Sequence, residues 1–230
     1  MLTCSVCGYQ NDDLATVCSS CKGFLQAKVD GLNLFQTIWG LMETPGGTFR
    51  RIVLSRIKNY IFLLSSLFGI AAALGFAWYR NLGKVFTSLL TLVGTGMLVG
   101  SLAGSLLVAL ASILLVFLSG LLGGKPKFRN MFAVVSYSAV PVILSLVFVF
   151  PIELAIFGPY LFDNNPPPIV LNPVLYSALL GFDVIAVCWS CYLLWKGNIV
   201  VSGFPRGKAL LVTLGLVTVI GAGVYALRYV

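Results

Sequence analysis

Residues 86–122 read FTSLLTLVGTGMLVGSLAGSLLVALASILLVFLSGLL, a run of 37 residues without one charged side chain. About 20 apolar residues in helical conformation cross the roughly 30 Å hydrocarbon core of a bilayer. The run is therefore long enough for one extended transmembrane helix or for two tightly turned ones. Either alternative places the chain among the membrane proteins.

Four further apolar runs have the ordinary length of a transmembrane span. They cover residues 60–79, 131–157, 174–195 and 209–227. Of the 230 residues, 59% are hydrophobic and 10% are charged, whereas soluble domains carry about 25% charged residues. We therefore expect an all-α membrane protein built as a bundle of five transmembrane helices.

Lys and Arg residues concentrate on the cytoplasmic side of membrane proteins and so indicate the orientation of the spans. With five spans and a cytosolic N-terminus, 12 of the 15 Lys and Arg residues lie in cytosolic segments and 3 lie outside. Two spans within residues 86–122 would give 7 inside and 8 outside. The first 30 residues are polar and lack the apolar core of a signal peptide. We therefore predict five spans, N-in and C-out.

Four cysteines near the N-terminus form two CxxC pairs, Cys4 with Cys7 and Cys18 with Cys21. Two such turns supply the four thiolates of a tetrahedral zinc site, whose metal provides folding energy to a segment too short for an apolar core. The alternative, two redox-active pairs, lacks the βαβ context of a thioredoxin-like site. We expect a structural Zn²⁺ in a small zinc ribbon ahead of the bundle, because four thiolates leave no position for a catalytic water.

Gly96, Gly100 and Gly104 recur at every fourth position of the long run. Small residues at this spacing let another helix approach closely in lipid, where no hydrophobic effect drives association. Helix packing within the bundle is the favoured interpretation of this glycine stripe. A contact between two copies of the chain is the alternative.

Glu153 and Asp183 are acidic residues inside the apolar runs, and no Lys or Arg within a span would neutralise them. An ionised carboxylate at mid-bilayer costs about 2.5–3.5 kcal/mol on insertion scales. We expect Asp183 to be protonated or hydrogen-bonded to a neighbouring helix and Glu153 to reach the headgroups. A cation- or proton-binding pair is the functional alternative. Cys188 and Cys191, three residues apart, are interpreted as apolar filling, with a soft-metal site beside Asp183 as the alternative.

The segment between the cysteines and the first span holds a short apolar helix that ends before Pro45. Its apolar side chains fall within residues 32–42, which is too short to span and suits a helix lying in the membrane interface. We divide the chain into a zinc ribbon at residues 1–26, a linker with this interfacial amphipathic helix at 27–58, and a transmembrane domain at 59–230.

The N-terminal segment resembles the zinc ribbons that precede many bacterial membrane proteins, whose pattern is roughly CxxCGxxNxxxAxxCxxCGxxL. The matching residues are Cys4, Cys7, Gly8, Asn11, Ala15, Cys18, Cys21 and Leu25. Lys22 and Gly23 stand where the family pattern has glycine directly after the fourth cysteine, and we expect this departure to shift the second turn. The resemblance implies a structural domain or one that contacts another macromolecule.

The rest of the chain resembles the Yip1 family of five-helix membrane proteins, in its bacterial form. The residues that carry the resemblance are Thr44-Pro45-Gly46-Gly47-Thr48-Phe49-Arg50-Arg51, Leu122-Gly123-Gly124-Lys125, Phe128 and Tyr137-Ser138-Ala139-Val140-Pro141. Eukaryotic members are associated with Rab GTPases and vesicle traffic, but their DLYGP-type signature is missing from this sequence. The resemblance therefore implies the fold and a general role in membrane organisation, without GTPase binding.

Two functional hypotheses follow. The first is a non-enzymatic scaffold or trafficking-type protein of the bacterial cytoplasmic membrane, whose cytosolic ribbon contacts a protein partner; a homo-oligomer is compatible with it. The second is a small transporter or channel with a pathway past Asp183. The sequence holds no histidine and no catalytic motif, so we expect no enzyme. The net charge of +8 comes from residues that flank the apolar runs, so lipid and not nucleic acid is the expected partner.

Overall fold

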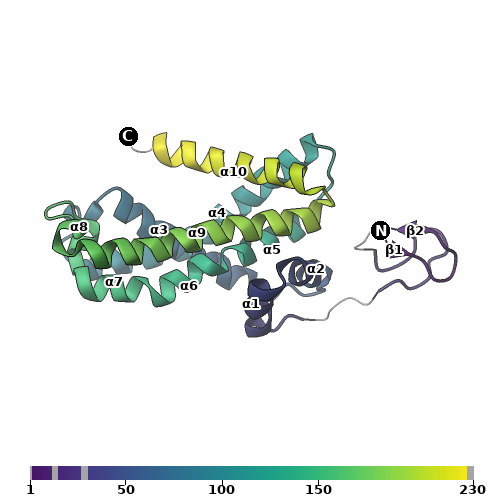
Figure 1. The fold of residues 1–230 in the computed structure, drawn as a ribbon, viewed down its shortest axis with the longest axis horizontal. Helices are drawn as coiled ribbons and strands as arrows, with labels where there is room; N and C mark the ends of the chain where they lie inside the picture. The colour runs from purple at the N-terminus through teal and green to yellow at the C-terminus, as the bar shows by residue number, and fades with distance from the viewer. Residues whose placement is uncertain (1, 12–14, 27–30, 227–230) are drawn as a thin grey trace. The chain divides into compact units, whose positions relative to one another are not determined.

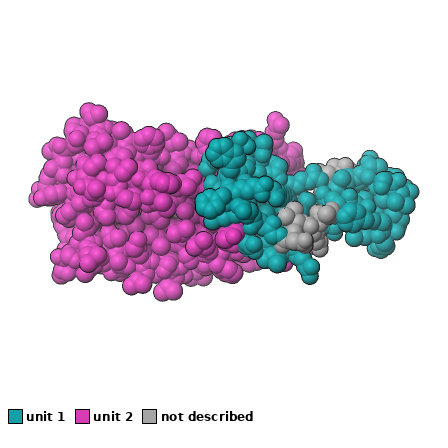
Figure 2. All heavy atoms as spheres, turned by 90° about the horizontal axis from the view of Figure 1, so that it is seen from below, with its two compact units in different colours: residues 1–59 teal, residues 60–230 magenta. Residues whose placement is uncertain are grey.

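The computed structural model describes residues 2–11, 15–26 and 31–226. The chain forms two compact units, residues 1–59 and 60–230, which are coloured separately in Figure 2. The first unit holds the cysteine-rich segment and two short helices, and the second holds the long apolar helices. Each unit is described by itself below.

The cysteine-rich segment consists of two tight turns, each closed by a short antiparallel pairing. Strand β1 (Leu2–Thr3) pairs with β2 (Gln10–Asn11) around the first turn. A single bridge between Val17 and Phe24 closes the second turn. Each pairing brings the two ends of a CxxC loop together and so holds its cysteines at one place.

The first unit continues with two short helices, α1 (Leu34–Glu43) and α2 (Pro45–Leu54). The end of α1 before Pro45 agrees with the prediction. Helix α2 was not predicted from the sequence, because Pro45 and the glycines after it are also typical of the end of a helix. Pro45 instead occupies the first turn of α2, where a missing N–H costs nothing and the fixed φ favours the helix.

Among the described residues, the second unit contains five helical spans that are long and apolar enough to cross a membrane. Their helices are labelled in Figure 1. The unbroken helices are α3 (Ile61–Tyr79), α4 (Leu89–Leu121), α9 (Pro173–Ser202) and α10 (Arg206–Ala226). The third span runs from Phe128 to Phe162 in shorter pieces. The short connecting elements are η1 (Leu82–Lys84) and α8 (Pro168–Leu171). The all-α, five-helix fold agrees with the prediction.

Helix α4 resolves the two alternatives for residues 86–122. It is one uninterrupted helix of 33 residues, from Leu89 to Leu121. Its start is fixed by a capping box, in which the Ser88 side chain accepts a hydrogen bond from the Thr91 N–H. At 1.5 Å per residue the helix is about 50 Å long, which exceeds the bilayer core, so it tilts or extends beyond the core.

The third span is broken where the sequence places prolines. It comprises α5 (Phe128–Ser138), α6 (Val140–Phe148), α7 (Phe150–Phe157) and the 3₁₀ turn η2 (Gly158–Phe162). Pro141 and Pro151 lie in the first turns of α6 and α7, where the missing N–H groups interrupt the helical hydrogen bonds. Of these pieces, α5 and α6 both pack against α9.

The glycine stripe of α4 lies directly against α3. A β-carbon on Gly100 would come within 2.6 Å of the Gly69 carbonyl oxygen, and one on Gly104 would overlap the Ser65 carbonyl oxygen. Gly96 faces the side chain of Leu74. Backbone meets backbone along this contact, so a second copy of the chain would have to use another face.

Candidate metal centre and intramembrane cavity

The four N-terminal cysteines converge on one point. Their sulfur atoms all lie within 4.8 Å of one another. Two short contacts join the two CxxC turns, which we call the knuckles: Cys4 to Cys21 and Cys7 to Cys18, each with 3.6 Å between the sulfurs. A tetrahedral zinc with Zn–S bonds of about 2.3 Å holds its sulfurs about 3.8 Å apart. The donor set therefore fits one four-thiolate metal site better than two separate dithiol pairs.

The two knuckles repeat the same backbone path 14 residues apart. In the first, the Gly8 N–H donates to the Cys4 carbonyl (2.9 Å); in the second, the Lys22 N–H donates to the Cys18 carbonyl (3.1 Å). Gly8 has a φ of 70° and Lys22 a φ of 60°, both left-handed. The prediction that the second turn is shifted is therefore wrong, because Lys22 adopts the same left-handed backbone conformation as Gly8.

Backbone N–H groups of the turns point at the sulfurs and favour thiolates. The N–H of Cys21 lowers the pKa of Cys18 to about 6, and the N–H of Cys7 likewise lowers the pKa of Cys4. At Cys21 the Gly23 N–H acts in the same direction, but the neighbouring thiols of Cys7 and Cys4 raise the pKa to about 12. Without a metal the cluster retains thiol protons, and metal binding must displace them.

Asn11 supports the cluster from outside the four sulfurs. Its side chain is buried, and its amide nitrogen donates to the Cys18 sulfur at 3.5 Å. Its carbonyl oxygen accepts from the Ser19 N–H at 2.9 Å. Asn11 thus links the end of β2 to the second knuckle and stabilises the Cys18 thiolate, as such outer groups do at metal sites.

The second unit holds a cavity of about 440 Å³ between α3, α6, α7 and α9. Glu153 of α7 and Asp183 of α9 both line it, together with Ser145 of α6. The Ser145 hydroxyl donates to the Asp183 carboxylate, which agrees with the expected hydrogen bond to a neighbouring helix. The lining contains no Lys or Arg.

Glu153 does not reach the headgroups as expected. Only 7% of its surface is exposed, and it lies in the cavity close enough to Asp183 for their carboxyl groups to interact. Pro151 lies in the first turn of α7, which is a helix separate from α6, and helical periodicity over the whole span does not predict this division. The sequence shows two acidic residues in apolar runs without a basic partner, and this marks both as unusual. It does not show that their side chains lie close together.

Cys188, Cys191 and Asp183 do not form a cluster that could bind a metal ion. Cys188 lines the same cavity, but among the described residues the four N-terminal cysteines are the one cluster of three or more potential metal ligands. Both membrane cysteines are free thiols.

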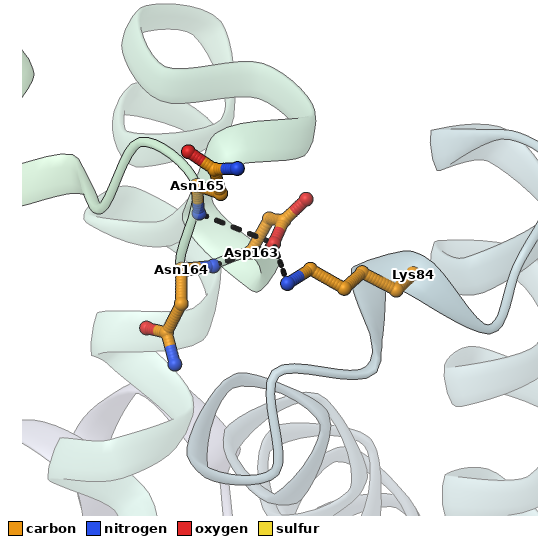
Figure 3. Close-up of polar contacts among 4 residues, drawn as sticks. All are labelled: Lys84, Asp163, Asn164 and Asn165. Atoms are coloured by element: carbon orange, nitrogen blue, oxygen red, sulfur yellow. Dashed lines mark hydrogen bonds and ion pairs between the residues drawn. The ribbon is translucent and has the colours of Figure 1, made fainter.

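An ion pair connects the loops at one end of the bundle. The Lys84 ammonium lies 3.5 Å from the Asp163 carboxylate, which also accepts the backbone N–H groups of Asn164 and Asn165 (Figure 3). The Lys84 side chain is 61% exposed, so this pair adds little stability. It joins the loop after the third span to the loop after the first.

The fold and its sites define an α-helical integral membrane protein with a four-cysteine N-terminal domain that fits a metal. Residues 39–227 match the Yip1 domain, and the chain belongs to the Yip1 domain family. The family assignment made from the sequence is thereby confirmed. No curated protein and no solved structure matches the chain.

Proposed function

We propose that this protein is a non-enzymatic membrane scaffold whose zinc ribbon contacts a protein partner. The observation that carries the proposal is the apolar surface of the ribbon. Val6 and Phe24 are 74% and 70% exposed, and Tyr9 and Val17 are also exposed. A segment that folds around a metal has no need to display large apolar side chains, and such surfaces mark interaction sites.

These side chains belong to both knuckles. Val17 pairs with Phe24 through the backbone bridge, and Val6 lies beside Gly23, the neighbour of Phe24. The metal cluster holds both turns in place and so preorganises the surface. In this proposal Zn²⁺ is structural: Cys4, Cys7, Cys18 and Cys21 hold it, and it supplies folding energy and no chemistry.

We further propose that α1 lies in the membrane interface. Phe35 and Trp39 are one helical turn apart and are 82% and 67% exposed. Aromatic side chains with this spacing favour the boundary between headgroups and acyl chains. Arg51 of α2 donates a hydrogen bond to Gln36 of α1 at 3.3 Å. This contact places a cation next to the helix that carries the aromatic pair, where it can attract anionic lipid headgroups.

The proposed location is a bacterial cytoplasmic membrane, with the N-terminus in the cytosol and the C-terminus outside. Support comes from the distribution of Lys and Arg, 12 against 3 for five spans. This orientation keeps the cysteines in a reducing compartment, where thiolates persist as metal ligands.

The test is site-specific photo-crosslinking from the ribbon in intact cells. We expect a discrete crosslinked partner with the native ribbon, and its loss when Val6→Ser and Phe24→Ser are combined. Gln10→Ser, which alters another exposed ribbon residue, is the matched control and should keep the partner. Cys4→Ser should abolish the crosslink by unfolding the ribbon. An unchanged set of partners in both ribbon variants would contradict the scaffold proposal.

The cavity favours a second candidate, a small transporter or channel with a pathway past Asp183. Its support is that Asp183 lines an internal volume large enough for a small solute. Flux of monovalent cations or protons into proteoliposomes should fall with Asp183→Asn. Equal flux for both proteins, or none, would rule this candidate out.

A further inference from the structure

The cavity is a groove between α3, α6, α7 and α9 that begins near one end of the bundle. On α9 it extends from Tyr176 to Cys188, a rise of about 18 Å. Trp78 of α3 and Tyr176 lie at one end of this stretch and are joined by a hydrogen bond from the indole N–H (3.3 Å). The carboxyl groups of Glu153 and Asp183 lie farther along it, among aliphatic walls.

The groove has room that its own side chains leave open. At Gly75, which lines it on α3, a β-carbon would meet no atom within 4 Å. The volume of about 440 Å³ falls in the usual range for small-molecule sites. Leu74, Leu146, Leu161 and Phe162 are among the apolar residues that line it.

The two acids in this groove lack a counter-charge. Glu153 is more than nine-tenths buried, and its carboxyl group interacts with that of Asp183. Asp183 has the Ser145 hydroxyl as its donor, a neutral group. Buried carboxyl groups inside a membrane are costly unless a cation or a proton compensates them.

The donor set restricts what can fill the groove. Ca²⁺ and Mg²⁺ require six or more oxygen ligands, and the acid pair with Ser145 offers too few among apolar walls. A neutral lipid chain would fill the volume but leave the acids uncompensated. A ligand with an amine cation on an apolar body satisfies both the charge and the walls, and Trp78 and Tyr176 add to the lining two aromatic rings of the kind that attracts cations.

We propose that this groove binds organic ammonium ions with an apolar body, with Glu153 and Asp183 receiving the ammonium group. The proposal is independent of the ribbon and its partner. It names a ligand class for the cavity, whether the protein binds, senses or moves that ligand. A phosphate-bearing lipid fits less well, because its anion would lie beside the acid pair.

The test is equilibrium dialysis of n-octylammonium against the full-length protein in a nonionic maltoside detergent, with n-octanol as the neutral isostere. We expect saturable binding of one octylammonium and no saturable binding of octanol. Glu153→Gln and Asp183→Asn should each weaken binding about tenfold or more, because each removes one partner of a desolvated charge pair. Asp163→Asn removes an acid of the same unit outside the groove and should bind as the native protein does.

A steric variant tests the place of binding separately from its charge. Gly75→Leu keeps both acids, fills the open volume and replaces glycine within a helix, so it should fold and lose binding. Elution as a monodisperse species and an unchanged unfolding temperature verify each variant. Absence of saturable binding, equal affinity of the amide variants, equal binding of octanol, or full binding by Gly75→Leu would each overturn the proposal. None of these results bears on the ribbon, whose test uses other residues.

Discussion

Lys22 adopts the backbone conformation of Gly8, with a φ of 60° against 70°, so that both knuckles present their sulfurs in the same way. A left-handed conformation at a residue with a β-carbon costs roughly 1–2 kcal/mol. The ribbon therefore carries strain at Lys22 that the equivalent position in the first knuckle avoids.

Replacement of Lys22 by glycine should strengthen zinc binding. The substitution relieves the left-handed strain but adds entropy to the unfolded chain, so we expect a net gain of about 1 kcal/mol or less. Gly8→Lys should weaken binding for the converse reason. Competition with a chromophoric chelator measures both affinities. Equal affinities for native protein and Lys22→Gly would show that the turn is not strained.

Zinc affinity should decrease as the pH is lowered, and it should decrease more steeply below pH 6. Cys21, with its pKa of about 12, must release a proton on metal binding throughout this range. Cys18, with its pKa of about 6, is a thiolate at neutral pH and holds a proton only below that value. Below pH 6 each bound metal thus displaces one more proton. The slope of log affinity against pH, from chelator competition between pH 5 and 8, tests this; a constant slope would contradict it.

Asn11→Ala should weaken zinc binding without removing a ligand. It deletes the donor to the Cys18 sulfur and the acceptor for the Ser19 N–H. Losses of outer-shell partners typically reduce metal affinity about 10–100-fold. Cobalt substitution provides the control, since the visible spectrum should still show four thiolate ligands. A spectrum with fewer thiolates would mean that Asn11 holds the fold and not only the metal environment.

Gly104→Ala should destabilise the bundle strongly. Its added methyl group would overlap the Ser65 carbonyl oxygen, so α3 and α4 must separate, at a cost of about 1–3 kcal/mol or more. Gly94→Ala, on the same helix with no atom near the new carbon, should be neutral or stabilising. Unfolding of the detergent-solubilised protein measures the pair of variants. Equal stabilities would show that α3 and α4 do not meet at this stripe.

The two termini should lie on opposite sides of the membrane. An odd number of spans requires this, and α4 as one helix gives five spans among the described residues. Reporter fusions active only in the cytosol or only outside should respond at the N- and C-terminus respectively. Reporters with the same response at both ends would contradict five spans.

The sequence by itself determined the spans, the four cysteines and the family. These properties are local: a run of apolar residues spans a bilayer wherever it lies, and CxxC turns position their own sulfurs. Charge along the chain favoured one helix over residues 86–122, and α4 has that form. Helix α2 was missed because Pro45 starts a helix as readily as it ends one.

Only the tertiary structure decided which faces meet. The glycine stripe could have served any helix, and α3 occupies it because Gly69 lets the two backbones touch. Glu153 and Asp183 lie 30 residues apart in sequence, on different helices, and the folded chain brings both to one cavity. Hydropathy records how deeply a side chain can lie in a membrane, but not its neighbour, which depends on the packing of whole helices.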